Sequence, residues 1–180
     1  MAMSETEKLI KANEDLARSG PLFPVLFPNV LFPARLQGPE SSSGGGLAIL
    51  TCMDPRVRLD FIPGFERVTS IIRNAGGIVT DDVVRSLMVS NEVLGVKEFL
   101  IINHTDCAML KFKDLELQGR LEKKYGREAG LMKFYTFSSL EQNIKDQVQK
   151  VKNHPIVPKD ITVSGLIYDV ETRKLSRPGT

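Results

Sequence analysis

Two short apolar runs constrain the fold of this chain more than any other feature. Residues 47–51 (LAILT) and 99–103 (FLIIN) are almost wholly aliphatic or aromatic, and polar loops follow both. A run of about five apolar residues fits a strand that is buried on both faces, whereas a buried helix usually needs at least ten. Strands of this kind are typical of parallel sheets covered by helices.

Segments with helical patterns lie between such strands. We expect strands at residues 47–51, 68–72, 99–103 and 161–167, and helices at residues 4–19, 81–94, 114–125 and 138–152. Ser4 and Glu7 have the spacing of a capping box at the first helix, and Gly95 follows the second. The alternation predicts a single-domain α/β fold, with a mainly parallel β-sheet flanked by helices.

A proline-rich segment precedes the first strand. Residues 21–46 contain five of the ten prolines and repeat Leu-Phe-Pro three times, which excludes a helix or a central strand there. The segment can wrap its own domain with the rings on the surface, or it can cover a partner subunit or an active site. We therefore divide the chain into an N-terminal helix and arm (residues 1–46) and an α/β catalytic core (residues 47–180).

The charge and the N-terminal sequence limit the partners and the compartment. The net charge of +2 is too small to suggest a nucleic-acid-binding or membrane-surface protein, and no apolar run is long enough for a membrane span. The first twenty residues mix acidic and basic side chains without an apolar signal region. We expect a cytoplasmic protein, and its reducing environment disfavours a disulfide between the two cysteines.

Three potential metal ligands follow two of the predicted strands. Cys52 comes directly after the first strand, His104 after the third, and Cys107 three residues later. Sites in parallel sheets form beyond the carboxyl ends of the strands, so these side chains converge if the two strands are neighbours. Two thiolates and one imidazole suit zinc, and three protein ligands leave a position open, as in catalytic zinc sites.

A carboxylate and an arginine follow the first cysteine. Asp54 can face the open metal position, and Arg56 can hold that carboxylate in a bidentate salt bridge. An arginine partner lowers the pKa of a carboxylate, which would keep Asp54 a hydrogen-bond acceptor for metal-bound water. The alternative is an exposed surface ion pair, which usually contributes little to stability. Because a potential metal ligand, Cys52, lies two residues before Asp54, we favour a functional role for the Asp54–Arg56 pair.

Other interpretations of these residues are weaker. Cys52 and Arg58 fit the Cys-x5-Arg phosphate loop, but Pro55 removes a backbone N–H that such a loop needs, and Asp54 would repel phosphate. A thiol redox pair is disfavoured because the cysteines are far apart in sequence. A zinc-stabilised binding domain without activity remains the non-enzyme alternative, although Asp54 and Arg56 are both present.

Three motifs follow one another in the chain: CMDPR at residues 52–56, RNAGG at 73–77 and HTDC at 104–107. In this order they resemble the motifs of the β-class carbonic anhydrases, and a weaker similarity covers residues 163–170. Their wording is most like a short subgroup that includes carbonyl sulfide hydrolases. The resemblance implies a mainly parallel sheet flanked by helices and a homodimer or homotetramer.

The same resemblance implies a site and a reaction. Cys52, His104 and Cys107 would bind one Zn²⁺ per subunit, and Asp54 and Arg56 would be the catalytic pair. The small-molecule substrate would be carbon dioxide, hydrated to bicarbonate, or alternatively carbonyl sulfide, which gives carbon dioxide and hydrogen sulfide. In some relatives the aspartate leaves its arginine and displaces the zinc-bound water, and Asp54 is expected to be able to do so.

Two departures from the family pattern affect the predicted substrate pocket. Ala108 replaces the usual glycine after the second cysteine, and Gln37 is the only candidate for an N-terminal glutamine that many relatives aim at the substrate. We expect Gly76 and Ala108 to lie at the pocket, with Val57 and Ile72 as candidates for its apolar wall. The second histidine, His154, is expected at a helix end or on the surface.

Overall fold

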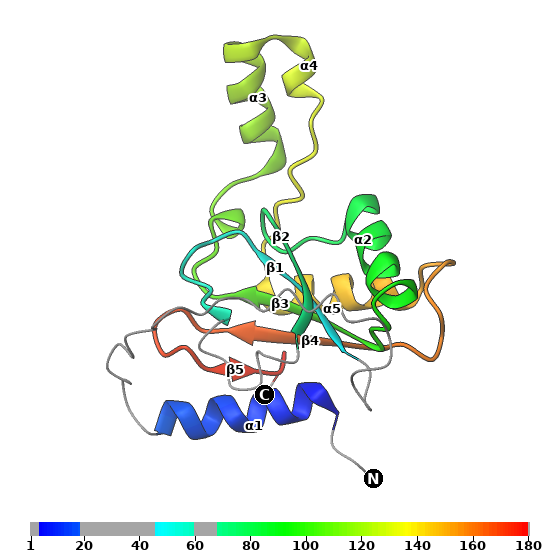
Figure 1. The fold of residues 1–180 in the computed structure, drawn as a ribbon. Coiled ribbons are helices and arrows are strands. Elements are labelled where there is room, and N and C mark those ends of the chain that lie inside the picture. Colours follow the sequence, from blue (N-terminus) through cyan, green and yellow to red (C-terminus); the bar gives the residue numbers. More distant parts are fainter. Residues whose placement is uncertain (1–3, 19–45, 60–67, 180) are drawn as a thin grey trace, which may run out of the picture.

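The structure is a computed structural model that describes residues 4–18, 46–59 and 68–179. Its centre is a five-stranded sheet in the order β2-β1-β3-β4-β5 (Figure 1). The strands are β1 (Leu47–Cys52), β2 (Val68–Asn74), β3 (Glu98–His104), β4 (Thr162–Tyr168) and β5 (Leu175–Ser176). The first four are parallel and β5 is antiparallel to β4. The mainly parallel α/β sheet expected from the sequence is confirmed.

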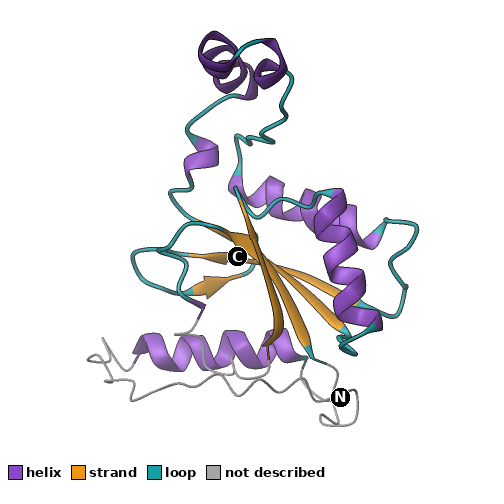
Figure 2. Ribbon diagram, turned by 45° about the horizontal axis from the view of Figure 1, so that its top comes forward, coloured by secondary structure: helices purple, strands orange, loops and turns teal. Residues whose placement is uncertain are grey.

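Helices cover both faces of this sheet (Figure 2). Helices α2 (Asp81–Glu92) and α5 (Leu140–Lys152) pack on one face, where Leu87 and Val151 share a core cluster with Leu50 of β1. Helix α1 (Glu5–Arg18) covers the other face, and its Leu9 lies in a second cluster with Ile49. Neighbouring residues of β1 therefore enter different clusters, as the alternation of side chains along a strand requires.

The helix ends follow the signals in the sequence. The backbone N–H of Ser4 donates to the Glu7 carboxylate, and the Glu7 N–H donates to the Ser4 hydroxyl, so the capping box is confirmed. Ser139 Oγ accepts a hydrogen bond from the Gln142 N–H at the start of α5. Gly95, after α2, has φ of +70°, a backbone conformation that glycine adopts without cost.

Some boundaries differ from the predicted ones. Strand β2 extends to Asn74, two residues beyond the prediction, because its pairing with β1 continues to Cys52. The polar C-terminal tail contributes β5, a two-residue strand too short for a sequence pattern to predict. The Leu-Phe-Pro segment lies outside the described residues, except for Gly46, and the division of the chain at residue 46 stays a prediction.

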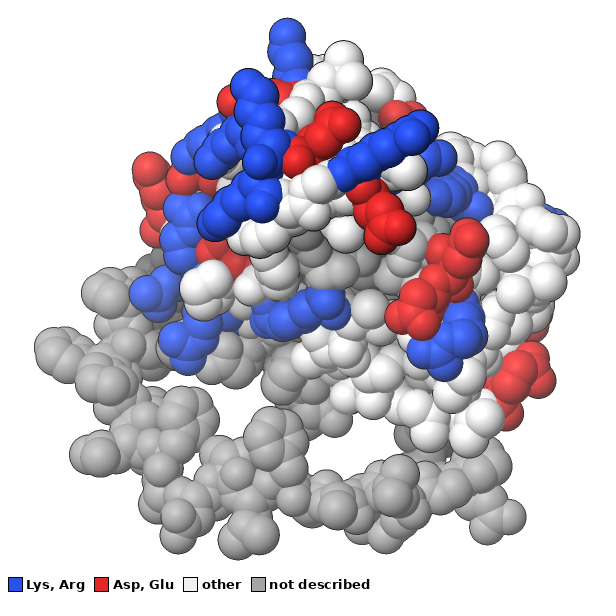
Figure 3. Space-filling view, turned by 90° about the horizontal axis from the view of Figure 1, so that it is seen from above, with Lys and Arg blue, Asp and Glu red and all other residues white. Residues whose placement is uncertain are grey.

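A helical hairpin stands away from the body of the protein in Figure 1. It consists of α3 (Asp114–Tyr125) and the short helix α4 (Arg127–Gly130), and among the described residues none of their side chains is buried. At the base of the hairpin, the Asp114 carboxylate joins the start of α3 to the segment after α4, because it accepts hydrogen bonds from the backbone N–H groups of residues 134–136. On the face seen from above, Lys and Arg side chains are interspersed with those of Asp and Glu (Figure 3).

None of the helices in residues 4–18, 46–59 and 68–179 combines the length and the apolar character needed to cross a bilayer.

Candidate metal centre

The ends of β1 and β3 bring Cys52, His104 and Cys107 together. β1 and β3 are hydrogen-bonded neighbours, with Thr51 opposite Ile102, so the two strands end side by side. The Sγ atoms of the cysteines and a ring nitrogen of His104 all lie within 4.8 Å of one another, and all three residues are buried. The convergence expected from the sequence therefore holds in the structure.

The hydrogen bonds of His104 prepare one nitrogen for a cation. Its Nδ1 lies 2.8 Å from the Thr105 carbonyl oxygen, which can only accept, so Nδ1 carries the proton. Nε2 is then a bare lone pair, and it has no hydrogen-bond partner within the described ranges although it is buried. An unpartnered buried polar atom is unfavourable. A cation bound by this nitrogen and the two sulfurs would satisfy it, and this donor set suits zinc.

The two thiols have opposite pKa shifts. A hydrogen bond with Cys107 is the main reason that the pKa of Cys52 is lowered, against the effect of burial, and His104 and the backbone of Asp54 and Gly76 lower it further. The same hydrogen bond and burial raise the pKa of Cys107. The pair thus loses its first proton readily and its second reluctantly, and a bound cation favours the loss of both.

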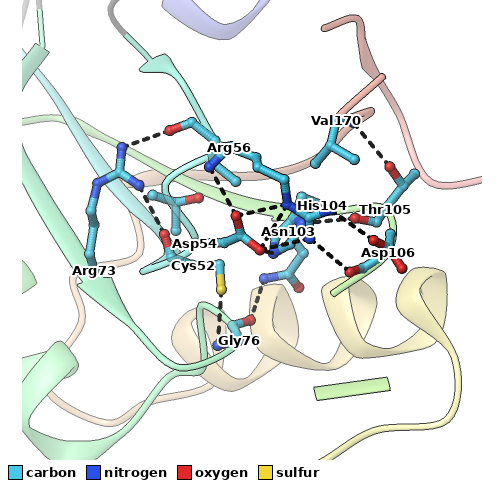
Figure 4. A network of polar contacts seen from close by, with 12 residues as sticks. Cys52, Asp54, Arg56, Arg73, Gly76, Asn103, His104, Thr105, Asp106 and Val170 are labelled. Atoms are coloured by element: carbon cyan, nitrogen blue, oxygen red, sulfur yellow. Dashed lines mark hydrogen bonds and ion pairs between the residues drawn. The ribbon is translucent and has the colours of Figure 1, made fainter. Parts of the chain in front are cut away.

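Asp54 and Arg56 form the bidentate pair that the spacing predicts. Arg56 Nη2 lies 2.8 Å from Asp54 Oδ2, and Arg56 Nε lies 3.0 Å from Oδ1 (Figure 4). These hydrogen bonds lower the pKa of Asp54 to about 2, so the carboxylate is ionised at neutral pH. Asp54 Oδ2 is also 3.9 Å from His104 Nε2, which places the carboxylate beside the potential ligands.

A second carboxylate on the same arginine was missed at the sequence level. Arg56 Nη1 donates to Asp106 Oδ2 over 2.7 Å, and Nη2 donates to the Asp106 carbonyl oxygen over 3.1 Å. Lys111 Nζ contacts the other carboxylate oxygen of Asp106. The pKa of Asp106 is lowered to about 2, first by Arg56 and then by Lys111. The position of Asp106 between two potential ligands is the only signal the sequence offered.

Arg73 fixes the loop that carries Asp54 and Arg56. Its Nη1 donates to the Cys52 carbonyl oxygen over 3.0 Å, and its Nη2 donates to the Val57 carbonyl oxygen over 2.9 Å. The guanidinium thus ties both ends of the loop to the end of β2 (Figure 4). Its presence in the RNAGG motif gave no indication of this role.

The glycine turn after β2 contacts the site directly. The Gly76 N–H donates to Cys52 Sγ over 3.4 Å, and the Gly76 carbonyl accepts a hydrogen bond from Asn103 Nδ2 over 2.7 Å. Asn103 in turn accepts from Asn143 of α5. A buried network from α5 therefore positions the turn, and hydrogen bonds to a ligand sulfur tune its charge.

The other predicted pocket residues have different outcomes. Ala108 begins the 3-10 helix η3 (Ala108–Leu110) with a φ that is not positive, so the methyl group demands no unusual backbone. Val57 lies in one core cluster and Ile72 packs against the other, and their place at a pocket wall stays a prediction. Gln37 lies outside the described residues. His154 follows the end of α5, as predicted.

Comparison with known proteins identifies relatives of two kinds. The family model for carbonic anhydrase matches residues 47–127. Carbon disulfide hydrolase from Saccharolobus solfataricus is 36% identical over 156 residues, which cover 73% of this chain and 76% of the relative. Beta-carbonic anhydrase 1 from Mycobacterium tuberculosis is 31% identical over 82% of this chain and 91% of the relative.

The same two kinds of relative are found among the solved structures. The crystal structure of carbonic anhydrase from Streptococcus mutans has a TM-score of 0.68 and 31% identity, and the match covers 99% of this chain and 100% of that chain. The apo form of carbon disulfide hydrolase has a TM-score of 0.66 and 32% identity, with coverage of 74% and 78%.

Proposed function

Because the chain belongs to the β-carbonic anhydrase family, we propose that it is a zinc enzyme that hydrates carbon dioxide to bicarbonate. Cys52, His104 and Cys107 are the proposed zinc ligands, and Asp54 and Arg56 are the proposed catalytic pair. The observation that carries the proposal is the convergence of three potential ligand atoms within 4.8 Å, beside a carboxylate held by an arginine.

The residues of the chain have distinct roles in this proposal. Bound zinc would supply a nucleophile at neutral pH by lowering the pKa of a water molecule. Asp54, with its pKa of about 2, accepts hydrogen bonds at neutral pH but holds a proton poorly. Asp54 therefore orients the nucleophile and does not accept the proton that the water molecule releases. That proton must be transferred to solvent or buffer. The bond from His104 Nδ1 to the Thr105 carbonyl keeps Nε2 available to the metal.

A sulfur-containing substrate is the second candidate. It is favoured by relatives named carbon disulfide hydrolase at 33% and 36% identity. Carbonyl sulfide and carbon disulfide are linear and electrophilic at carbon, like carbon dioxide, so the same arrangement of residues suits them. Carbonyl sulfide plus water gives carbon dioxide and hydrogen sulfide, and carbon disulfide plus two waters gives carbon dioxide and two hydrogen sulfides.

The assembly and the compartment are further parts of the proposal. From the family we infer one zinc ion per subunit and a homodimer or homotetramer in the cytoplasm, with no nucleic-acid or membrane partner. The N-terminal arm and the catalytic core remain the proposed division of the chain.

One zinc-loaded sample tests both candidates. Hydration of carbon dioxide is measured by stopped-flow, and sulfide release is measured with carbonyl sulfide and with carbon disulfide, with Cys107→Ser as the metal-poor control. The proposal predicts that carbon dioxide has the largest kcat/KM and that the control is inactive. A larger kcat/KM for either sulfur compound would favour the second candidate, and negligible turnover of all three would exclude the enzyme interpretation.

A further inference from the structure

Arg56 is held on two edges, and only one of them belongs to the proposed catalytic pair. Its Nε and Nη2 donate to Asp54, whereas its Nη1 and Nη2 donate to the carboxylate and the carbonyl oxygen of Asp106. A guanidinium has five N–H donors in one plane, so partners on two edges fix both the position and the tilt of that plane. Asp106 therefore restricts Arg56 in addition to Asp54.

The location of Asp106 links it to the metal centre. It lies between His104 and Cys107, in a turn where its φ is +53°, a left-handed conformation that aspartate tolerates better than most residues. The turn that delivers two potential ligands thus also delivers the partner of Arg56. Arg56 itself belongs to the loop after Cys52, so the arginine bridges the two ligand-bearing segments (Figure 4).

The exposure of Arg56 gives a second partner a role. The side chain of Arg56 is 44% exposed, and a single ion pair at such a site contributes little and exchanges readily with water. Networks of several charges hold their geometry better than isolated pairs do. Lys111 extends this network, because its Nζ approaches Asp106 Oδ1 within 2.6 Å.

Small movements of Asp54 matter at this site. The three potential ligand atoms lie within 4.8 Å of one another, and Asp54 Oδ2 is 3.9 Å from one of them, His104 Nε2. The carboxylate is therefore already as close to His104 as the other potential ligands are required to be. If Arg56 turned away, the carboxylate could join the ligands and close the position that a substrate or an anion needs.

We infer that Asp106, supported by Lys111, is a positioning residue that holds Arg56 and thereby keeps Asp54 from becoming a fourth metal ligand. The inference rests on the proposed metal site and adds a residue to it. Asp106 acts through Arg56 and has no direct role in the reaction.

Anion binding to the cobalt-loaded protein tests this inference without turnover. The probe is thiocyanate, whose dissociation constant is read from the visible absorption of cobalt(II) at constant pH. Asp106→Ala should raise this constant about tenfold, the lower end of the usual effect of residues that orient metal-site groups. Asp106→Asn, which keeps the left-handed preference, and Lys111→Met should raise it less. Asp82→Ala removes an exposed Asp–Arg pair on α2 and should leave it unchanged.

A double variant separates positioning from general loosening. If Asp106 acts through Arg56, the Arg56→Ala/Asp106→Ala protein should bind thiocyanate no more weakly than Arg56→Ala alone. Additive losses, or a constant for Asp106→Ala within twofold of the unsubstituted protein, would overturn the inference. If Asp106→Ala does not retain cobalt, Asp106→Asn and Lys111→Met replace it in the test. Thiocyanate dissociation constants within twofold of that of the unsubstituted protein would then overturn the inference. Absent carbon dioxide turnover with normal thiocyanate binding would reject the proposed function alone.

Discussion

Replacing Gly77 with alanine should destabilise the protein and disturb the site, because this residue has two independent reasons to be glycine. Its φ is +61°, where a side chain costs about 1–2 kcal/mol. An added Cβ would also lie 2.6 Å from Asn103 Nδ2, closer than real Cβ atoms come without a shift, and 3.2 Å from the Cys52 backbone nitrogen, which is a tight contact. Overpacking of this kind costs about 1–3 kcal/mol. We therefore expect Gly77→Ala to lower the free energy of unfolding by about 2–5 kcal/mol, the sum of the two costs.

Gly95→Ala is the matched control. Gly95 has a similar φ of +70°, but an added Cβ there would meet nothing within 4 Å. The free energy of unfolding of Gly95→Ala should fall only by the conformational cost, about 1–2 kcal/mol. Alanine also restricts the unfolded chain at both positions, which offsets part of each loss by about 0.4–1 kcal/mol and cancels in the comparison.

Urea unfolding followed by far-ultraviolet circular dichroism measures both variants, with chelator present so that metal affinity does not contribute. The steric account requires Gly77→Ala to be less stable than Gly95→Ala by about 1–3 kcal/mol. Zinc affinity should fall in Gly77→Ala only, because the displaced Asn103 no longer holds the Gly76 carbonyl. Equal losses of stability in the two variants would refute the reasoning.

Three further outcomes follow from the site, the hairpin and helix α5. Cys107→Ser should abolish stoichiometric zinc binding, measured by metal analysis after dialysis, and retained zinc would contradict the ligand assignment. Asp114 has a lowered pKa because Thr136 and three backbone N–H groups bind its carboxylate, so its stabilisation is complete above its ordinary pKa of 3.8 and is lost as pH falls through the lower folded value. Asp114→Asn should remove that part of the acid dependence of unfolding, and an unchanged profile would exclude this role. Ser139→Ala should cost about 1 kcal/mol in urea unfolding by removing the cap of α5, and no loss would show that the cap is dispensable.

Local patterns predicted most of the fold because they depend on neighbouring residues. The apolar runs before Cys52 and His104 identified β1 and β3, since a strand buried on both faces must be apolar along its length. Ser4 and Glu7 identified the start of α1 for the same local reason. The two-residue strand β5 had no such signature, because it forms only by pairing with the end of β4.

The sequence by itself determined which residues can bind a metal and that they lie at or just after the ends of two strands. Only the tertiary structure decided that β1 and β3 are neighbours, which brings Cys52 within reach of His104. It also decided that Arg56 has Asp106 as a second partner and that Gly76 donates to a cysteine sulfur. The last two contacts join residues 50 and 24 positions apart. They depend on strand order and on the shape of turns, which the periodicity of a single segment does not encode.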